Sequence, residues 1–434
     1  MIRGSELGRL LWPLSSLLSG VGLLIVGVGL LFSVVGLRAG LANFSGLTLG
    51  LVMSAYFAGF VLGTYVGPMI IRRVGHIRTF AAMASVASTM AILHALWIDP
   101  WFWGLLRLVT GVCLVGLYIV VESWLNALAP NEHRGKVFAA YMSVNFVALA
   151  LGQWLILVGD RLGFVPFAMV SVLFSFALLP ITLTPVNQPA PVEAPSFSLR
   201  TLYLASPLGV AVAFASGLLN GTFYSMGALY AVGVGLSDAG VAAFMAATIL
   251  GGAIFQWPVG HYSDSHDRRS VLLWVCLGAA ALAAVAFVLP ALNVGWLVGV
   301  GLLYGGLVFT VYGLGVAHVN DVIDSSRLLE FTSGLLLVHG VGAAVGPVLA
   351  GGVMDQFGAN SLMVFFAVVL VLLALYTIKR MGAAPPVPEA AKADYVVMGS
   401  GSQAVLQMDP RDTSEVSPPA EQPAPPPAAS HHSP

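Results

Sequence analysis

The sequence predicts an all-α membrane protein of twelve transmembrane helices, arranged as two six-helix pseudo-symmetric bundles. Three observations support this fold class. Only 9% of the 434 residues are charged and 58% are hydrophobic, long apolar runs recur along the chain, and residues of the first half recur in the second at a nearly constant spacing. A soluble domain carries about 25% charged residues, so this chain has too little polar surface to be covered by water on all sides.

The apolar runs are long enough to be transmembrane helices, because a helix of about 20 residues crosses the bilayer core. They are continuously apolar instead of alternating, which favours helices over a β-barrel. The first run is too long for a cleaved signal peptide and lacks a small-residue cleavage site. The predicted spans are residues 12–36, 46–71, 79–98, 101–126, 137–158, 163–183, 204–231, 239–258, 270–290, 295–318, 330–353 and 359–379.

Positively charged residues predict the orientation of these spans. Only Arg38 and Arg161 lie in loops on the side of the membrane opposite the N-terminus. Thirteen of the 18 Lys and Arg lie at the N-terminus, in even-to-odd connections or just after the last span, namely Arg3, Arg9, Arg72, Arg73, Arg78, Arg134, Lys136, Arg200, Arg268, Arg269, Arg327, Lys379 and Arg380. Because positive residues are retained in the cytoplasm, we expect both termini to be cytoplasmic.

An internal repeat relates the two halves. The matched pairs are Gly29–Gly221, Ser33–Ser225, Met53–Met245 and Gly59–Gly251 at a spacing of 192 residues, and Gly111–Gly305, Tyr118–Tyr312, Asn126–Asn320 and Gly152–Gly346 at a spacing of 194. Six spans is an even number, so the two copies share one orientation and are related by an axis along the membrane normal. Transporters with this architecture hold their substrate between the halves.

Composition divides the chain into four parts. Residues 1–183 form the first six-helix bundle, residues 184–203 a short Pro-rich cytoplasmic linker, and residues 204–380 the second bundle. Residues 381–434 form a Pro/Ala-rich cytoplasmic tail with eleven of the 25 prolines. Such a composition cannot bury a core, so we expect this tail to be disordered.

Residues Gly260–Arg269 resemble the G-x-L-x-D-R-x-G-R-R signature of the major facilitator superfamily. The resemblance implies a cytoplasmic gate in which acid and bases form a charge cluster that latches the two halves. In the second half this gate would contain Gly260, Asp264, Arg268 and Arg269. The first-half copy retains Arg73 and the turn residue Gly75, but it has Arg72 where the family has an acid.

Further elements extend the resemblance over about residues 10–380. Arg107–Gly111 is similar to the family's R-x-x-x-G element, which is associated with proton coupling, and Gly342–Pro347 is similar to its G-x-x-x-G-P element. Residues Gly116–Asn126 and Arg134–Phe138 resemble the uncharacterised YcaD-like bacterial branch. The resemblance implies the major facilitator fold, in the inner membrane of a bacterium, and secondary active transport by alternating access.

The fourth predicted span carries a polar stripe of Arg107, Gly111, Tyr118 and Glu122, which lie on one face of a helix. A charge inside a membrane helix costs at least about 2.5 kcal/mol and usually faces a water-filled path. We expect Arg107 to line the outer cavity and to bind an anionic group or tune proton affinity. For Glu122 two roles stay open: a proton carrier nearer the cytoplasm, or a structural partner of Arg72, Arg73 or Arg134.

The second half contributes further candidates for the substrate and proton pathway. Asn220 and Tyr224 lie one helical turn apart, and the tenth span contains Tyr304, Tyr312 and His318. These side chains suit hydrogen bonding to a ligand, although hydrogen bonds between helices are the equally open alternative. His318 is expected to titrate near neutral pH or to be solvated at its helix end. Asn145 and His339 occupy matching places, for which we expect packing between the halves.

The sequence lacks the motifs that several other functions require. The sequence contains no G-x-x-x-x-G-K-[ST] phosphate loop, no H-E-x-x-H motif and no basic stripe for nucleic acid. Cys113 and Cys276 are isolated in apolar runs and are expected to be small buried hydrophobic residues. We therefore expect no enzyme activity, no metal and no cofactor.

The function expected is secondary active transport of a small-molecule substrate of unknown identity, coupled to protons, by a monomer in the lipid bilayer. The alternative is a transporter-like membrane sensor or partner-binding protein without flux. The two differ in whether reconstituted protein moves a solute that it binds.

Overall fold

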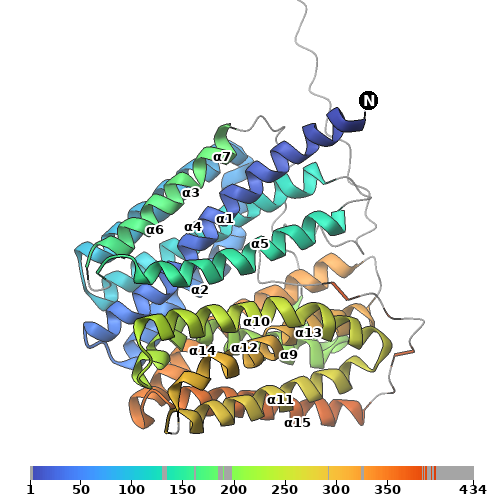
Figure 1. Ribbon diagram of the computed structural model, residues 1–434. Helices are drawn as coiled ribbons and strands as arrows, with labels where there is room; N and C mark the ends of the chain where they lie inside the picture. Colours follow the sequence, from blue (N-terminus) through green and yellow to red (C-terminus); the bar gives the residue numbers. More distant parts are fainter. Residues whose placement is uncertain are drawn as a thin grey trace, which may run out of the picture.

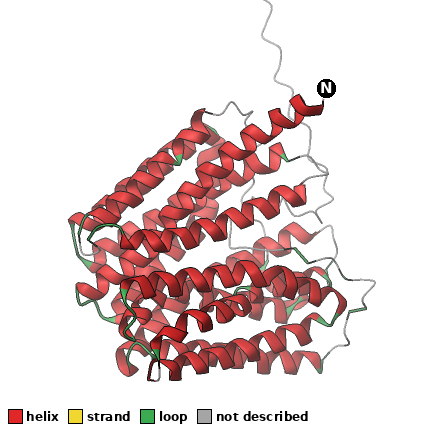
Figure 2. Ribbon diagram, in the orientation of Figure 1, coloured by secondary structure: helices red, strands yellow, loops and turns green. Residues whose placement is uncertain are grey.

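The computed structural model describes residues 3–129, 134–160, 163–183, 189, 198–291, 293–323, 327–383, 385, 387–388, 392 and 395–396. Every regular element within these ranges is a helix (Figure 2). Twelve helices there are long and apolar enough to cross a membrane, and each overlaps one predicted span. The predicted fold class is therefore confirmed. The side chains of Arg3, Arg9 and Arg134, residue Arg161, and most of residues 184–203 and 381–434 lie outside the described part.

The first half contributes six spans. They are α1 (Arg3–Leu41), α2 (Gly46–Val74), α3 (His76–Leu96), α4 (Pro100–Leu128), α5 (Arg134–Trp154) with the 3-10 helix η2 (Leu155–Leu157), and α6 (Val165–Phe176) with α7 (Leu178–Leu183). Side-chain caps define the starts of α2 and α4. Ser45 Oγ accepts a hydrogen bond from the Thr48 backbone N–H at 3.1 Å, and Asp99 Oδ1 accepts one from that of Phe102 at 2.8 Å. These caps satisfy backbone donors that the first turn of a helix leaves unpaired.

The second half repeats the pattern. Its elements are α8 (Leu199–Ala205), α9 (Pro207–Gly233), α10 (Asp238–Ser265), α11 (Arg268–Val288), η3 (Leu289–Ala291), η4 (Val294–Trp296), α12 (Leu297–Val308) with α13 (Thr310–Asn320), α14 (Leu328–Phe357) and α15 (Ser361–Met381). Ser237 caps α10 through the Gly240 N–H, as Ser45 caps α2. Helix α10 continues to Ser265, beyond the predicted end at residue 258, because Pro258 is tolerated inside the helix and the polar residues after it form its last turns.

The two halves also repeat several close helix contacts. In each of these contacts a glycine lies against a backbone carbonyl of a neighbouring helix, so that an added Cβ would clash. The equivalent contacts are Gly59 with Leu108 and Gly251 with Leu302, Gly111 with Tyr56 and Gly305 with Thr248, and Gly152 with Val26 and Gly346 with Leu218. Every equivalent pair obeys the spacings of 192 and 194 found in the sequence. The internal repeat is thus a repeat of helix packing.

The halves lie side by side, joined by contacts of α1 with α9, α2 with α14 and α5 with α10 (Figure 1). We call the end where α7 ends and α9 begins the linker end, and the opposite end, where α2 and α10 begin, the distal end. Figure 1 shows the halves converging toward the distal end and splayed apart toward the linker end, where the N-terminus lies.

Contacts between α2 and α14 close the distal end. The backbone N–H groups of Gly46 and Leu47 both donate to the carboxylate of Asp355, with 2.8 Å for Leu47. Gly50 lies against the backbone carbonyl of Pro347. The first turn of α2 therefore meets an acid of the other half, and the positive end of the helix dipole favours this charge.

Candidate transport cavity

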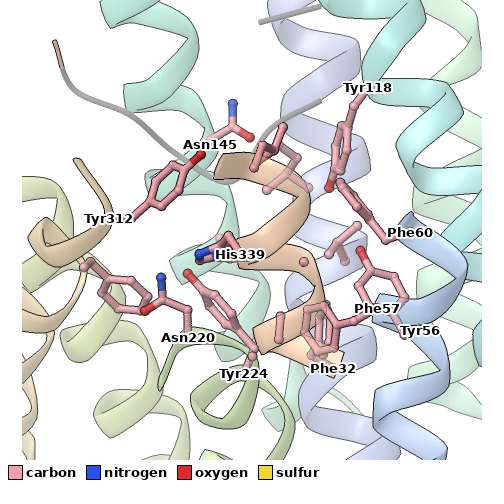
Figure 3. Close-up of a pocket in the computed structure, with 18 of the residues that line it drawn as sticks. Phe32, Tyr56, Phe57, Phe60, Tyr118, Asn145, Asn220, Tyr224, Tyr312 and His339 are labelled. Atoms are coloured by element: carbon pink, nitrogen blue, oxygen red, sulfur yellow. The ribbon is translucent and has the colours of Figure 1, made fainter. Parts of the chain in front are cut away.

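A cavity lies between the halves near the middle of the spans (Figure 3). It encloses about 1320 Å³ of space, part of which is open to solvent. Its walls come from α1, α2, α4 and α5 of the first half and from α9, α10, α13 and α14 of the second. A site built equally from two halves changes shape whenever the halves move relative to each other.

Aromatic rings form the distal boundary of this cavity. Phe32 of α1 lies 6.1 Å from Tyr224 of α9 between ring centroids, which joins the two halves. Phe57 lies 6.0 Å from Phe32, and Phe309 lies 5.6 Å from Tyr224. Phe309 stands between α12 and α13, at a break in the tenth span. Together with the contacts of α2 and α14, these rings separate the cavity from the distal end.

Arg107 lies behind the cavity wall. Its side chain is 0% exposed, and its Cζ atom lies 4.6 Å from the Phe32 ring centroid and 4.7 Å from that of Tyr56. Among the described residues, none of its three guanidinium nitrogens has a hydrogen-bond partner. Phe32 and Tyr56 both line the cavity, so cation–π contacts connect this buried charge to the wall.

Glu122 is likewise 0% exposed and lies behind the wall. The Tyr141 hydroxyl, from α5, donates a hydrogen bond of 2.6 Å to Glu122 Oε1. Tyr141 itself lines the cavity and thus stands between the acid and the cavity space. Arg72 and Arg73 are exposed at the linker end of α2, so neither is the partner of this fully buried acid. The Arg134 side chain lies outside the described part of the structure.

The fold agrees with comparisons to known proteins. The family model of the Major Facilitator Superfamily matches residues 17–328. The chain belongs to the Major Facilitator Superfamily. An uncharacterised MFS-type transporter of Enterobacter sp. (strain 638) is 30% identical over 357 residues, which cover 80% of this chain and 91% of that protein. The uncharacterised MFS-type transporter YcaD of Escherichia coli O7:K1 (strain IAI39 / ExPEC) is 30% identical over 381 residues, 86% of this chain and 97% of YcaD. The resemblance to the YcaD-like branch is confirmed.

Solved structures of other transporters share the fold. A mutant of the nucleoside transporter NupG superposes with a TM-score of 0.74 at 12% identity, covering 85% of this chain and 99% of that chain. A bacterial homologue of the human lysosomal transporter Spinster, in an inward-facing and occupied conformation, gives a TM-score of 0.70 at 16% identity, with 88% and 97% covered. These identities establish the superfamily architecture alone. The chain is thus a multi-pass membrane transporter of this superfamily.

The structure brings four of the predicted pathway residues to the cavity wall. They are Tyr118, Asn220, Tyr224 and Tyr312. Arg107 and Glu122 lie behind the wall, as described above. Tyr304 instead packs against Phe366 of α15, with 5.6 Å between ring centroids. His318 lies at the linker end, in a second pocket formed with charged residues of that end.

Most lining residues of the first half were not singled out in the sequence. Phe32, Phe57 and Phe60 lie in continuously apolar spans, where periodicity does not distinguish a cavity from a helix contact. Asn145 and His339, for which packing was expected, both line the cavity. His339 Nδ1 is 3.0 Å from Ser216 Oγ, and its ring centroid lies 4.7 Å from that of Tyr312. The signal that could have found these two is their polarity at matching places on equivalent spans.

The superfamily signature forms an ion-pair cluster at the linker end. Arg268 pairs with Asp264 at 3.0 Å and with Asp321 at 2.7 Å, and its side chain is almost completely buried. The cluster thus ties α10 to α11 and to the end of α13, all within the second half. Asp321 is a member that the signature did not identify.

Two further features lie at the linker end: an ion pair in the second half and a turn glycine in the first. Arg269 pairs with Asp267 at 3.0 Å. Burial raises the pKa of the Asp267 carboxyl, but hydrogen bonds from Arg269 outweigh this, and the pKa lies below its ordinary value of 3.8. In the first half, Gly75 has a positive φ of 84° and ends α2, as a turn glycine would.

Two tail residues, Lys392 and Tyr395, contact the signature. The ring of Tyr395 lies where a Cβ on Gly260 or on Gly313 would be placed. The Tyr395 backbone N–H donates to Asp264 Oδ1 at 2.9 Å. Lys392 Nζ donates to the His266 carbonyl at 2.5 Å, at the end of α10. The absence of a side chain at Gly260 therefore makes room for this ring.

Proposed function

We propose that this superfamily member is a secondary active transporter that carries a small solute through the central cavity by alternating access. The observation that carries the proposal is that both halves contribute lining residues to one cavity while the distal end is closed. A rigid-body rotation of the halves would open the distal end and close the linker end. The bundle is complete within one chain, which supports a monomer.

The conformation is consistent with a cavity that faces the cytoplasm. The linker end carries most of the Lys and Arg residues found in the loops of this chain, including Arg72, Arg73 and Lys379, and positive residues are retained in the cytoplasm. With both termini on the cytoplasmic side of a bacterial inner membrane, the closed distal end would face the periplasm. The arrangement then corresponds to an inward-facing state.

Proton coupling is proposed to act through Glu122 and Tyr141. The Tyr141 hydroxyl donates a hydrogen bond to Glu122 Oε1, and both side chains are buried beside the cavity. A solute that displaces the Tyr141 hydroxyl from Glu122 would remove a donor from the carboxylate and favour its protonation. Solute binding and proton binding would thus be linked through one tyrosine. Arg107 is proposed to tune the same cavity through Phe32 and Tyr56.

The test uses purified protein in liposomes with an imposed pH gradient and a solute selected by thermal-shift screening. Wild-type protein should accumulate the solute in proportion to the gradient. Glu122→Gln should retain solute exchange but lose its dependence on the gradient, because glutamine cannot release a proton. Glu330→Gln is the matched control, because this partly exposed acid pairs with Arg327 at 3.0 Å and does not line the cavity. Unchanged gradient dependence in Glu122→Gln would refute the coupling.

The same assay separates transport from the alternative of a sensor without flux. A protein that binds the solute with saturation, yet moves none under either gradient direction, would be a sensor. Transport would then be excluded even though the cavity binds its ligand.

A further inference from the structure

Two clusters of lining residues differ in chemistry, although both halves contribute polar and apolar groups to the cavity. Phe32, Phe57 and Phe60 of the first half form a cluster of apolar rings, while Asn220, Gln256 and Tyr312 of the second half form a polar cluster, which we call the polar wall. Figure 3 shows the phenylalanine rings on one side and Asn220 and Tyr312 on the other. A single occupant would therefore meet rings on one face and hydrogen-bonding groups on the other.

The polar wall has unused hydrogen-bonding capacity. Asn220 is 8% exposed, Gln256 1% and Tyr312 3%. Asn220 Oδ1, Gln256 Oε1 and the Tyr312 hydroxyl have no hydrogen-bond partner in the structure. A buried polar atom without a partner costs free energy, which a ligand that supplies the partner recovers. Two of these atoms are acceptors, so the ligand must offer N–H or O–H donors, while the Tyr312 hydroxyl can donate to an acceptor of the ligand.

Charge is kept away from the cavity space. Among the described residues, the lining set contains no Asp, Glu, Lys or Arg. The two nearby charges, Arg107 and Glu122, are each covered by aromatic side chains that form the wall. A charged ligand would lose its hydration on entering and meet no opposite charge within direct contact, which is strongly unfavourable.

From these three observations we propose that the cavity binds an uncharged, ring-bearing solute whose polar edge carries at least one N–H or O–H donor. The ring lies against Phe32, Phe57 and Phe60, and the polar edge meets Asn220, Gln256 and Tyr312. This substrate class rests on the proposed transport function of the same cavity. It also assigns Arg107 no direct contact with the solute.

The test compares three probes that share one ring system and differ in charge: 2-naphthamide, 2-naphthoate and 2-naphthylmethylammonium. Binding to the full-length protein in detergent is measured at pH 7.5 as the concentration-dependent rise in Tm. The neutral amide should bind at least about tenfold more tightly than either ion, because only the ions lose hydration without a partner. Tighter binding of either ion, or no binding of the amide, would overturn the proposal.

Variants locate the polar edge. Asn220→Ala and Gln256→Ala should each weaken amide binding about 3- to 10-fold, the effect of losing one hydrogen bond. Asn360→Ala is the matched control, because Asn360 Oδ1 is also without a partner but does not line the cavity. Partition of the probe into detergent is the same for all variants and cancels in the comparison. Equal affinities in wild type, Asn220→Ala and Gln256→Ala would refute the assignment of the polar wall.

Failure of the substrate class can be distinguished from failure of the transport function. Amide binding without flux in liposomes would leave the substrate class intact and exclude transport. Gradient-driven flux of 2-naphthoate, with no binding of 2-naphthamide, would support transport and exclude the neutral class.

Discussion

Arg107 and Glu122 are the two charges within the membrane-spanning part of α4, and each is separated from the cavity by an aromatic side chain. Phe32 and Tyr56 cover the guanidinium, and Tyr141 covers the carboxylate. The equivalent positions of the second half hold Gly301 and Val316. The second copy of the repeat therefore folds without these charges, so the repeat architecture does not require them in α4.

Arg107→Met tests this at the level of one residue. The variant should leave the Tm unchanged or raise it, because it removes a buried charge without a counter-ion. Solute transport in liposomes should fall about 5- to 30-fold, as expected when about 1–2 kcal/mol of cation–π interaction with the wall is lost. Arg107→Lys retains the charge, so its transport rate should lie between those of wild type and Arg107→Met. A parallel loss of Tm and transport would show that Arg107 is structural.

At the scale of the element, the glycines that place helices in backbone contact are the most constrained positions. Gly111→Ala and Gly305→Ala should each lower the free energy of unfolding by about 1–3 kcal/mol, since the new Cβ meets a backbone carbonyl. Gly104→Ala is the control, because no atom lies within 4 Å of the position its Cβ would take. Unfolding can be followed with a thiol-reactive dye, because Cys113 and Cys276 are both free and buried. Equal stability of all three variants would contradict the packing repeat.

The contact of the tail with α10 and α13 is also testable. Docked Tyr395 should protect the Lys392–Ala393 bond from trypsin. Tyr395→Ala should raise the cleavage rate there about 5- to 30-fold, because loss of the docked ring removes about 1–2 kcal/mol of docking energy and cleavage follows the undocked fraction. Tyr395→Phe retains the ring and should remain protected.

Cleavage after Arg411, further along the same tail, is the internal reference for protease activity. Gly260→Val should act like Tyr395→Ala, since its side chain would occupy the space of the ring. Equal rates at Lys392 in all these proteins would show that the segment is not docked in solution.

At the scale of the whole molecule, the balance between the two orientations of the halves depends on contacts that form in only one of them. The Asp355 carboxylate, which accepts two backbone hydrogen bonds from the first turn of α2, is such a contact. Charge-assisted hydrogen bonds are stronger than neutral ones. Opening of the distal end must break both of them.

Asp355→Ala should therefore shift the population toward distal opening about tenfold or more, the effect of losing about 1.5–3 kcal/mol per charged hydrogen bond. Spin labels at Leu41 and Phe357, exposed positions at the distal end of opposite halves, report the separation by pulsed electron paramagnetic resonance. A longer-distance population should appear in Asp355→Ala and not in Gln356→Ala, which changes the neighbouring exposed residue. Identical distributions would show that Asp355 does not hold the distal end closed.

The sequence by itself determined that the chain lies in lipid, how many spans it has and that its halves repeat. These conclusions follow from the charge content, the lengths of the apolar runs and the spacing of matched residues, which are all one-dimensional properties. The sequence also identified Tyr118, Asn220, Tyr224 and Tyr312, since a polar group inside an apolar span is conspicuous. Only the tertiary structure decided which apolar rings line the cavity and that Arg107 and Glu122 lie behind its wall. It alone placed Asp321 beside Arg268 and Tyr395 beside Gly260. Whether an apolar side chain meets lipid, a helix or a cavity depends on how helices distant in the sequence pack together, and no local pattern records that.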